Sequence, residues 1–298
     1  MKKYLYILSQ RYSGSTLLSF LLATHPEVST IGERRKFYNK VIRYGDFPHH
    51  NAKHCSCGKL FGECDYLTDV KNQLLSKIDN RWLRTNATEL KIYDNKYLNK
   101  IAYEIHKTIL KTGISPFKNT VREHQKVNEE LVSTILKKDN TSVFLDSSKI
   151  INQALYLSQI PQFDFHVIWL IRDPRAQINS AMKHHSWSIE KATSMWLKEM
   201  VNNERILAQF DIKHIKLSYS ELCLNTESEM KRIFNFVNVN PENFSLDFRD
   251  QDHHIMGNYM RLQKDQKIVE RKEWKKSLTS DQIEYINKKT IDYEEYYS

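Results

Sequence analysis

Apolar runs and amphipathic stretches alternate along most of the chain. The stretch Tyr6–Pro26 begins as a short apolar run, breaks at a polar loop that contains Gly14, and resumes as an apolar, helix-like stretch. This pattern indicates a strand, a glycine-bearing turn and a helix. Such a turn presents several backbone N–H groups and the positive end of the helix dipole to one point, which suits a phosphate.

The same succession returns in the second half of the chain. Residues Ser142–Leu145 form a β-branched, apolar run, the polar turn Asp146–Lys149 follows, and apolar positions at helical spacing begin at Ile151. Val167–Ile171 is a continuous apolar run that ends on Arg172, and such runs are typical of strands buried on both faces of a parallel sheet. Two further units of strand, loop and helix are therefore predicted.

The remaining elements continue the alternation. A brief strand is expected within 27–33 and a strand with a turn within 214–222, and long helices are expected at Ile189–Phe210 and Glu227–Val237. Strands that alternate with helices throughout predict an α/β fold, with a phosphate-loop-type, doubly wound parallel sheet and helices on both faces.

The length of 298 residues and the 40% hydrophobic content are sufficient for one large α/β domain over 1–298. The stretch 34–140 is irregular and polar, with helical segments at Asp69–Leu83 and Asn99–Lys111. We interpret this stretch as an insertion or cap that carries substrate specificity, because a rigid sheet supports variable excursions.

The loop after the first strand partly matches a known phosphate-binding pattern. Residues 9–16 overlay G-x-x-x-x-G-K-[ST], with Ser9 at the first Gly, Gly14 and Thr16 in place, and Ser15 where Lys is required. That Lys contacts the β- and γ-phosphates in nucleoside triphosphatases, so its absence argues against ATP or GTP hydrolysis. The alternative is a plain serine-rich N-cap before a buried helix.

Two charged residues follow strand ends. Glu33 comes just after the brief second strand, and ligands in open parallel sheets lie outside the carboxyl ends of the strands. Glu33 is thus expected to face the same crevice as Gly14, unless it is a surface residue at a turn. Arg172 and Ser180 are spaced so that both could touch one anion; the alternative is an Arg172–Asp173 pair that stabilises the turn.

The net charge of +9 implies an anionic partner. Because Lys and Arg are scattered, and zinc-finger spacing and RNA-binding aromatic signatures are missing, we expect no nucleic-acid partner. No apolar stretch reaches the ~18 residues of a membrane-spanning helix, so no transmembrane segment and a cytoplasmic location are expected.

Three of the four cysteines are clustered in HCSCGKLFGEC as Cys55, Cys57 and Cys64. Three readings stay open. The first is three zinc ligands, with His54 or another histidine as the fourth, and the second is a disulfide plus a free thiol. The third reading is three buried structural thiols.

Several stretches together, in order and spacing, resemble the sulfotransferases that use 3′-phosphoadenosine 5′-phosphosulfate (PAPS), specifically a bacterial-type group. The resemblance covers nearly the whole chain. The matching stretches are YSGSTLLSFLLATHP, CSCGKLFGEC, LDSSK, WLIRDPRAQINS, YSEL, and HIMGNYMR followed by Trp274.

This resemblance implies PAPS as the sulfuryl donor and assigns residues to it. In such enzymes the N-terminal loop binds the 5′-phosphosulfate, while an Arg and a Ser bind the 3′-phosphate. The residues implied at the donor are Tyr12, Ser13, Gly14, Ser15, Thr16 and Leu17 in the loop, Arg172 and Ser180 at the 3′-phosphate, Tyr219 at adenine, and Asn258 and Arg261 in a closing loop.

For the transfer itself, the resemblance implies Glu33 as general base, with Lys149 and Arg11 as cationic stabilisers. The family more often has Arg or Lys immediately before Ser-Gly, whereas this chain has Tyr12 there and Arg11 one residue earlier. The alternative bases are His25, His253 and His254. No metal is assigned to the site, and the reaction is expected to require none.

The expected acceptor is a hydroxyl or an amine on a small molecule, sugar, lipid or peptide, shaped by 34–140. Two other functions remain as alternatives: an ATP-dependent small-molecule kinase of the phosphate-loop class, and a non-catalytic nucleotide-binding protein that has kept the fold.

Overall fold

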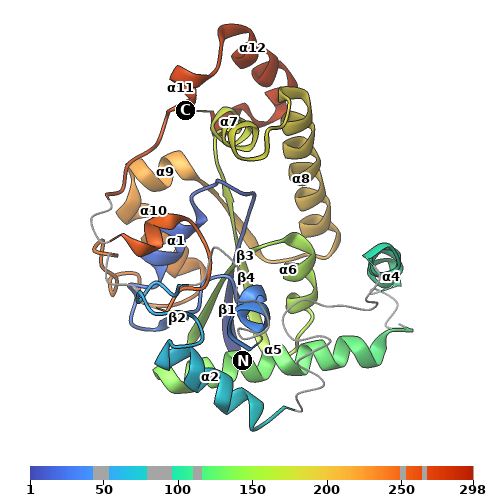
Figure 1. Ribbon diagram of the computed structural model, residues 1–298, viewed down its shortest axis with the longest axis vertical. Coiled ribbons are helices and arrows are strands. Elements are labelled where there is room, and N and C mark those ends of the chain that lie inside the picture. Colours follow the sequence, from blue (N-terminus) through green and yellow to red (C-terminus); the bar gives the residue numbers. More distant parts are fainter. Residues whose placement is uncertain (43–53, 79–95, 110–115, 249–252, 264–266, 298) are drawn as a thin grey trace.

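A parallel sheet of five strands forms the centre of the described chain (Figure 1). The computed structural model describes residues 1–42, 54–78, 96–109, 116–248, 253–263 and 267–297. The strand order is β2-β3-β1-β4-β5, and every pairing is parallel. The strands are β1 (Lys2–Ser9), β2 (Val28–Thr30), β3 (Val143–Lys149), β4 (Phe163–Ile171) and β5 (His214–Ser218).

Helices connect the strands, so that the fold is the doubly wound α/β architecture that the sequence predicted. The described helices are α1 (Ser15–Leu22), η1 (Arg34–Lys36), η2 (Tyr38–Ile42), α2 (Asp65–Leu75), α4 (Lys96–Ile109), α5 (Lys118–Asp139), α6 (Ile151–Ser158), α7 (Pro174–His185), α8 (Ile189–Gln209), α9 (Tyr219–Leu224), α10 (Thr226–Phe236), η5 (Tyr259–Leu262), α11 (Trp274–Ser277), α12 (Ser280–Lys289) and η6 (Ile291–Tyr296).

The two faces of the sheet carry separate hydrophobic cores, because successive strand residues point to opposite faces. On β1, Tyr4, Tyr6 and Leu8 face a core shared with α5, α6, α7 and α8. Leu5 and Ile7 face the other core, shared with α1 and α10. Figure 1 shows α1, α9 and α10 on one side of the sheet and α6 and α8 on the other.

The boundaries of β3 and of the segment after β5 differ from the prediction. Residues Asp146–Lys149, predicted as a polar turn, continue β3 to its end. The strand accommodates Asp146 because its carboxylate binds buried partners from other elements, described below. The predicted turn after β5 is the start of α9, in which Tyr219 and Leu222, one helical turn apart, are both buried.

The stretch 34–140 contains more regular structure than its composition indicated. Its described part ends in the 22-residue helix α5, whose Val127, Leu131 and Ile135 are buried in the core beside the sheet. Helix α2 begins at Asp65, earlier than predicted, and residues 79–83 of the predicted helix lie outside the described residues. Binding of an acceptor by this stretch stays a prediction, as does a single domain over 1–298.

Candidate functional site

The loop between β1 and α1 ends in a helix N-terminus that no described side chain caps. Gly14 is the N-cap of α1, and its backbone is left-handed, with φ 92°. The first N–H groups of an α-helix have no partner within the helix, and Gly14 has no side chain to accept from them. These N–H groups are thus available to an anion.

A close approach by another side chain also requires glycine at position 14. A Cβ added there would lie 2.2 Å from Cε2 of Tyr219, the first residue of α9. The ring of Tyr219 is buried against the loop. The sequence after β5 thus supports the loop after β1, and the proposed contact of Tyr219 with adenine stays a prediction.

Residues of α7 and α8 hold the loop region in place. Gln177 Nε2 donates to the carbonyl of Arg11 (2.9 Å), and Trp196 Nε1 donates to Gln177 Oε1 (2.9 Å). Gln10 Nε2 donates in turn to the carbonyl of Trp196 (2.8 Å). These bonds hold the loop region through the carbonyl of Arg11 and the side chain of Gln10, and they use none of the backbone N–H groups of residues 13–16.

Two buried hydroxyls of the loop region have no hydrogen-bond partner among the described residues. They are Ser9 Oγ and Ser13 Oγ, and Ser13 is only 1% exposed. A buried hydroxyl without a partner is uncommon, because its desolvation is uncompensated. The hydroxyl of Ser13 lies next to the left-handed Gly14, which fits a site that holds an oxyanion.

Arg172, at the end of β4, joins the loop to the C-terminal part of the chain. Its Nη1 donates to the carbonyl of Tyr12 (2.8 Å) and its Nη2 to the carbonyl of Arg271 (2.8 Å). Its guanidinium lies over the ring of Tyr219, 4.8 Å from the centroid. Asp173, the partner considered for Arg172 in the alternative interpretation, forms an ion pair with Arg175 Nη2 (2.8 Å).

Ser180 lies on α7, and its hydroxyl donates to the carbonyl of Ala176 (2.9 Å). This is a bond within the helix that Ser180 would exchange in order to donate to a phosphate. No contact between Ser180 and Arg172 is found in the described part of the chain. The shared anion contact of the two residues therefore stays a prediction.

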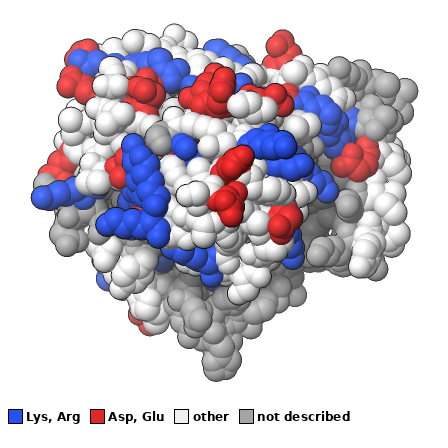
Figure 2. All heavy atoms as spheres, turned by 90° about the horizontal axis from the view of Figure 1, so that it is seen from above, with Lys and Arg blue, Asp and Glu red and all other residues white. Residues whose placement is uncertain are grey.

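A surface hollow rich in cations adjoins Arg172. It is lined by Lys267, Val269, Glu270, Arg271, Lys272, Glu273 and Lys276. The segment that carries these residues is held over α9, where Ser220 Oγ donates to Glu270 Oε1 (2.7 Å). On the face in Figure 2, Lys and Arg side chains lie among Asp and Glu.

The second group of candidate residues lies where β2 and β3 end. Lys149 Nζ and Glu33 Oε1 form an ion pair of 2.8 Å, and Arg35 Nε lies 3.6 Å from Glu33 Oε2. The Glu33 side chain is 10% exposed and that of Lys149 is 20% exposed. The parallel sheet thus brings together a carboxylate and an ammonium that the sequence assigned to the same site.

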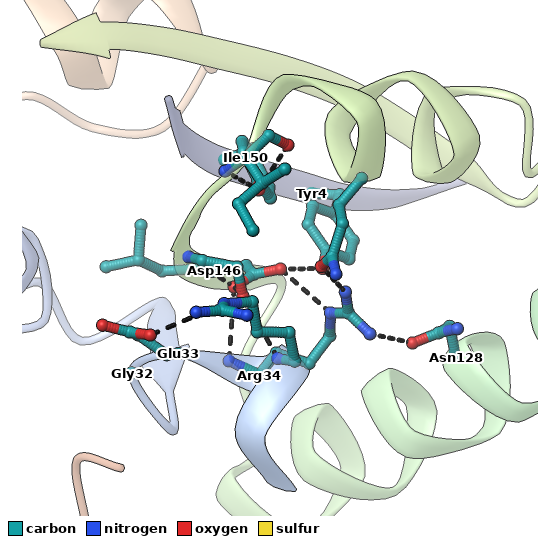
Figure 3. Close-up of polar contacts among 12 residues, drawn as sticks. Tyr4, Gly32, Glu33, Arg34, Asn128, Asp146 and Ile150 are labelled. Carbon is teal, nitrogen blue, oxygen red and sulfur yellow. Dashed lines mark hydrogen bonds and ion pairs between the residues drawn. The ribbon is translucent and has the colours of Figure 1, made fainter. Parts of the chain in front are cut away.

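A buried network around Arg34 and Asp146 lies beside Glu33 (Figure 3). Arg34 Nε binds Asp146 Oδ2 (2.9 Å), and the phenol of Tyr4 donates to the same oxygen (2.8 Å). Arg34 Nη2 also donates to Gln153 Oε1 (3.0 Å), and Nη1 donates to Asn128. The side chains of Arg34 and Asp146 are both fully buried.

The network contributes to the site because its members are adjacent in sequence to the candidate catalytic residues. Arg34 follows Glu33, and Asp146 accepts from the backbone N–H of Ser148 (2.9 Å), next to Lys149. Sequence reasoning missed this pair. The available signal was an aspartate directly after the apolar run Val143–Leu145, since a buried carboxylate requires a cation or several donors.

The segment after His253 lies against both groups of candidate residues. Ile255 pairs with Gly32, and its carbonyl accepts from the backbone N–H of Glu33 (3.0 Å). Further along, the backbone N–H of Asn258 donates to Thr16 Oγ1 (2.9 Å) in the first turn of α1. The segment 255–258 thus contacts both Thr16, next to the loop, and Glu33, the candidate base.

Arg261, in the same segment, is buried and donates from Nη1 to the carbonyl of His54 (2.6 Å). Burial lowers its pKa, which the charges of Cys55 and Glu33 partly offset. The side chain of Asn258 caps η5, accepting from the N–H of Met260 (3.0 Å). The predicted closing loop therefore packs on the site, and contact with a donor stays a prediction.

Arg11 and Tyr12 point toward α7 and α8. Arg11 is exposed. Burial raises the pKa of Glu199 on α8, and the positive charge of Arg11 partly offsets this rise. The ring of Tyr12 stacks on His184, with centroids 4.9 Å apart, and its hydroxyl lies 3.2 Å from His185 Nε2. No described contact joins Arg11 to Glu33 or Lys149.

Two of the alternative bases occupy structural positions. His25 is buried, and its Nε2 binds the carbonyl of Asn240 (2.9 Å). His254 is buried between Ser19 Oγ (3.1 Å) and the carbonyl of Met256 (2.9 Å), and burial lowers its pKa to about 3. His253 lies beside the cysteine cluster and is considered below.

The fold and the loop define an α/β protein with a glycine-bearing loop at the N-terminus of a helix, and comparison with known proteins identifies the family. The model of the Sulfotransferase family matches residues 5–243, so the chain belongs to this family. No curated protein matches the sequence.

The comparison with solved structures includes two sulfotransferases. The sulfotransferase domain from the Synechococcus PCC 7002 olefin synthase has a TM-score of 0.52 and 16% identity, covering 98% of this chain and 94% of its own. The sulfotransferase STF9 from Mycobacterium avium has a TM-score of 0.46 and 12% identity, covering 100% and 77%. The first supports the fold. No described helix has the length and apolar content to cross a membrane.

Proposed function

We propose that this sulfotransferase transfers the sulfuryl group of PAPS to a hydroxyl or amine acceptor. The observation that carries the proposal is the buried Ser13 hydroxyl, which has no described partner and lies at the uncapped N-terminus of α1. A buried donor beside free helix N–H groups suits a phosphate or sulfate oxygen. The position of the missing phosphate-loop Lys holds Ser15, as suits a donor without a γ-phosphate.

The donor's two anionic ends match two parts of the site. The 5′-phosphosulfate is proposed to bind the N–H and hydroxyl groups of 13–16, with Tyr12 and Leu17 flanking. The 3′-phosphate is proposed to bind Arg172 and Ser180, and the cations of the adjoining hollow increase the local positive potential. Two of the five N–H donors of Arg172 are used on carbonyls, so donors remain for a phosphate.

PAPS supplies the activated sulfuryl group, whose bond to the phosphate oxygen breaks as the bond to the acceptor forms. Glu33 is proposed to accept the acceptor's proton at a carboxylate oxygen. Lys149 is proposed to exchange its bond with Glu33 for one to the leaving phosphate oxygen, where negative charge develops. Arg11 can assist only if its exposed side chain turns toward the loop. The chain's own residues thus supply a base and a cation.

The acceptor is proposed to bind next to the Glu33–Lys149 pair. A small molecule, sugar, lipid or peptide is suitable, provided that it presents a hydroxyl or amine to Glu33. The stretch 34–140 begins directly after Glu33, which supports its proposed role in shaping this side of the site.

Calorimetric titration with adenosine 3′,5′-bisphosphate, the product of PAPS, tests the donor site. We expect tight binding of the bisphosphate and none of ATP with magnesium. Arg172→Ala should weaken binding by about 10- to 100-fold, as expected for a charge-assisted hydrogen bond of about 1.5–3 kcal/mol. The matched control is Arg205→Ala, which removes an exposed arginine of α8 bound to Asn202 and Gln209. Preference for ATP would overturn the proposal.

A further inference from the structure

Three cysteines and one histidine lie together on the side of the site formed by the 253–261 segment. Cys55, Cys57 and Cys64 come from one loop, and His253 comes from a segment 189 residues beyond Cys64. Their ligand atoms all lie within 4.8 Å of one another. The cysteines are free thiols, and Cys55 and Cys64 are fully buried.

The distances match those of a tetrahedral zinc site. Sγ of Cys64 lies 3.8 Å from Sγ of Cys55 and 3.8 Å from Sγ of Cys57, and 3.4 Å from Nδ1 of His253. In a regular tetrahedron with Zn–S bonds of about 2.3 Å and a Zn–N bond of about 2.0 Å, sulfurs lie about 3.8 Å apart and sulfur and nitrogen about 3.5 Å apart.

Backbone N–H groups are directed at all three sulfurs. Cys55 and Cys57 lie in a tight turn in which Gly58 has φ 88°, and His54 pairs with Leu60 across the turn. Each sulfur accepts a backbone N–H, from Cys57, Lys59 and Leu67 respectively. Cys64 is also the N-cap of α2, where the helix dipole favours negative charge.

The histidine is held in place by a neighbouring aromatic ring. The ring of His253 stacks on Tyr66, with centroids 4.4 Å apart and an interplanar angle of 6°. The hydroxyl of Tyr66 donates to Asp139 Oδ2 (2.7 Å) at the end of α5. This support fixes the orientation of the imidazole with Nδ1 toward Cys64, as the groups around metal-binding histidines commonly do.

We propose that Cys55, Cys57, Cys64 and His253 bind one Zn²⁺ ion in a closed Cys₃His site. Four protein ligands leave no position for water or substrate, so the site is structural. The zinc would join the 54–64 loop to the segment that contacts Glu33 through Ile255 and Thr16 through Asn258. His54, the fourth ligand considered from the sequence, instead contributes its carbonyl to Arg261.

Zinc content measured by mass spectrometry on the purified full-length protein tests the site without any substrate, so its result is independent of the proposed reaction. We expect one zinc per chain in the native protein. His253→Ala should lose the zinc, while His253→Cys, which restores a ligand at the same backbone position, should retain it. His54→Ala is the matched control and should retain it.

Two further measurements make the test decisive. Replacement of zinc by Co²⁺ should give the visible absorption of a tetrahedral cobalt–thiolate site. A chelator that removes zinc should lower the melting temperature of the native protein and leave that of His253→Ala unchanged. Native protein that holds neither zinc nor Co²⁺, a disulfide between two of the three cysteines, loss of zinc in His54→Ala, or an unchanged melting temperature after zinc removal would overturn the proposal.

Discussion

Glu33 and Lys149 form an ion pair of 2.8 Å although 116 residues separate them in the sequence. Glu33 follows the end of β2, and Lys149 is the last residue of β3, its neighbour in the sheet. Lys149 has a left-handed backbone, with φ 75°, which L-residues adopt at a cost. A strained residue whose side chain pairs with the candidate base is consistent with a functional constraint at this point.

Glu33→Gln is predicted to reduce turnover while leaving donor binding intact. Glutamine keeps the size of the side chain but cannot accept a proton, so kcat should fall by about 10²- to 10⁴-fold. Steady-state transfer assays give kcat, and titration with adenosine 3′,5′-bisphosphate gives the affinity. Glu284→Gln, an exposed glutamate on α12, is the control and should behave like the native protein. Unchanged kcat in Glu33→Gln would remove it as the base.

Arg34→Met is predicted to destabilise the fold strongly. It leaves the carboxylate of Asp146 buried without its cation, which should cost about 3–5 kcal/mol of the free energy of unfolding. Denaturant unfolding measures the change. The control is Arg232→Met, which removes an arginine paired with Glu229 on the surface of α10; exposed pairs contribute about 0–1 kcal/mol. Similar losses in the two variants would contradict the structural role of the buried pair.

The sheet and the position of the Gly14 loop could be predicted from local patterns. Val167–Ile171 is continuous and apolar, and a polar loop with Gly14 follows β1, so the strand and loop positions follow from nearby residues. Where partners are distant, local patterns were misleading. Asp146 resembled a turn residue, but Arg34 and Tyr4 bind its carboxylate and allow β3 to continue.

Side-chain partners from distant segments could not be obtained from the sequence. His253 rather than His54 completes the cysteine cluster, because the segment after His253 pairs with Gly32 beside β2. Gln177 and Trp196, which hold the loop after β1, are a polar and an aromatic residue within predicted helices, and nothing in the local pattern distinguishes them. Their function is apparent only when α7 and α8 are packed against the loop.

Gly14→Ala is predicted to cost more stability than strain alone explains. The left-handed backbone costs an L-residue about 1–2 kcal/mol, and the added Cβ would also collide with the ring of Tyr219. Gly58→Ala separates the two effects, because Gly58 has φ 88° but no atom within 4 Å of an added Cβ. Both variants should be less stable in thermal unfolding, and only Gly14→Ala should also lose bisphosphate binding. Equal losses of stability in Gly14→Ala and Gly58→Ala, with bisphosphate binding intact in both, would show that the contact with Tyr219 is unimportant.

Stability is predicted to fall as the pH drops below about 6.5, the ordinary pKa of histidine. His166, on β4, is buried, and burial, with the nearby Lys213 ammonium, lowers its pKa against the opposing effect of Asp164. A depressed pKa means that the folded chain binds fewer protons than the unfolded chain between the folded and unfolded pKa values. The free energy of unfolding therefore rises with pH across this range, and the contribution of His166 to it is lost as the pH falls through the range.

His166→Gln isolates this contribution because glutamine does not titrate. Chemical unfolding of both proteins at several pH values between 5 and 8 should give a steeper fall below about 6.5 for the native protein than for the variant. Lys213, whose Nζ lies 2.6 Å from His166 Nε2, provides the second variant. Lys213→Met should make protonation of His166 less costly and reduce the pH dependence. Parallel curves for the native protein and His166→Gln would show that other groups account for the acid sensitivity.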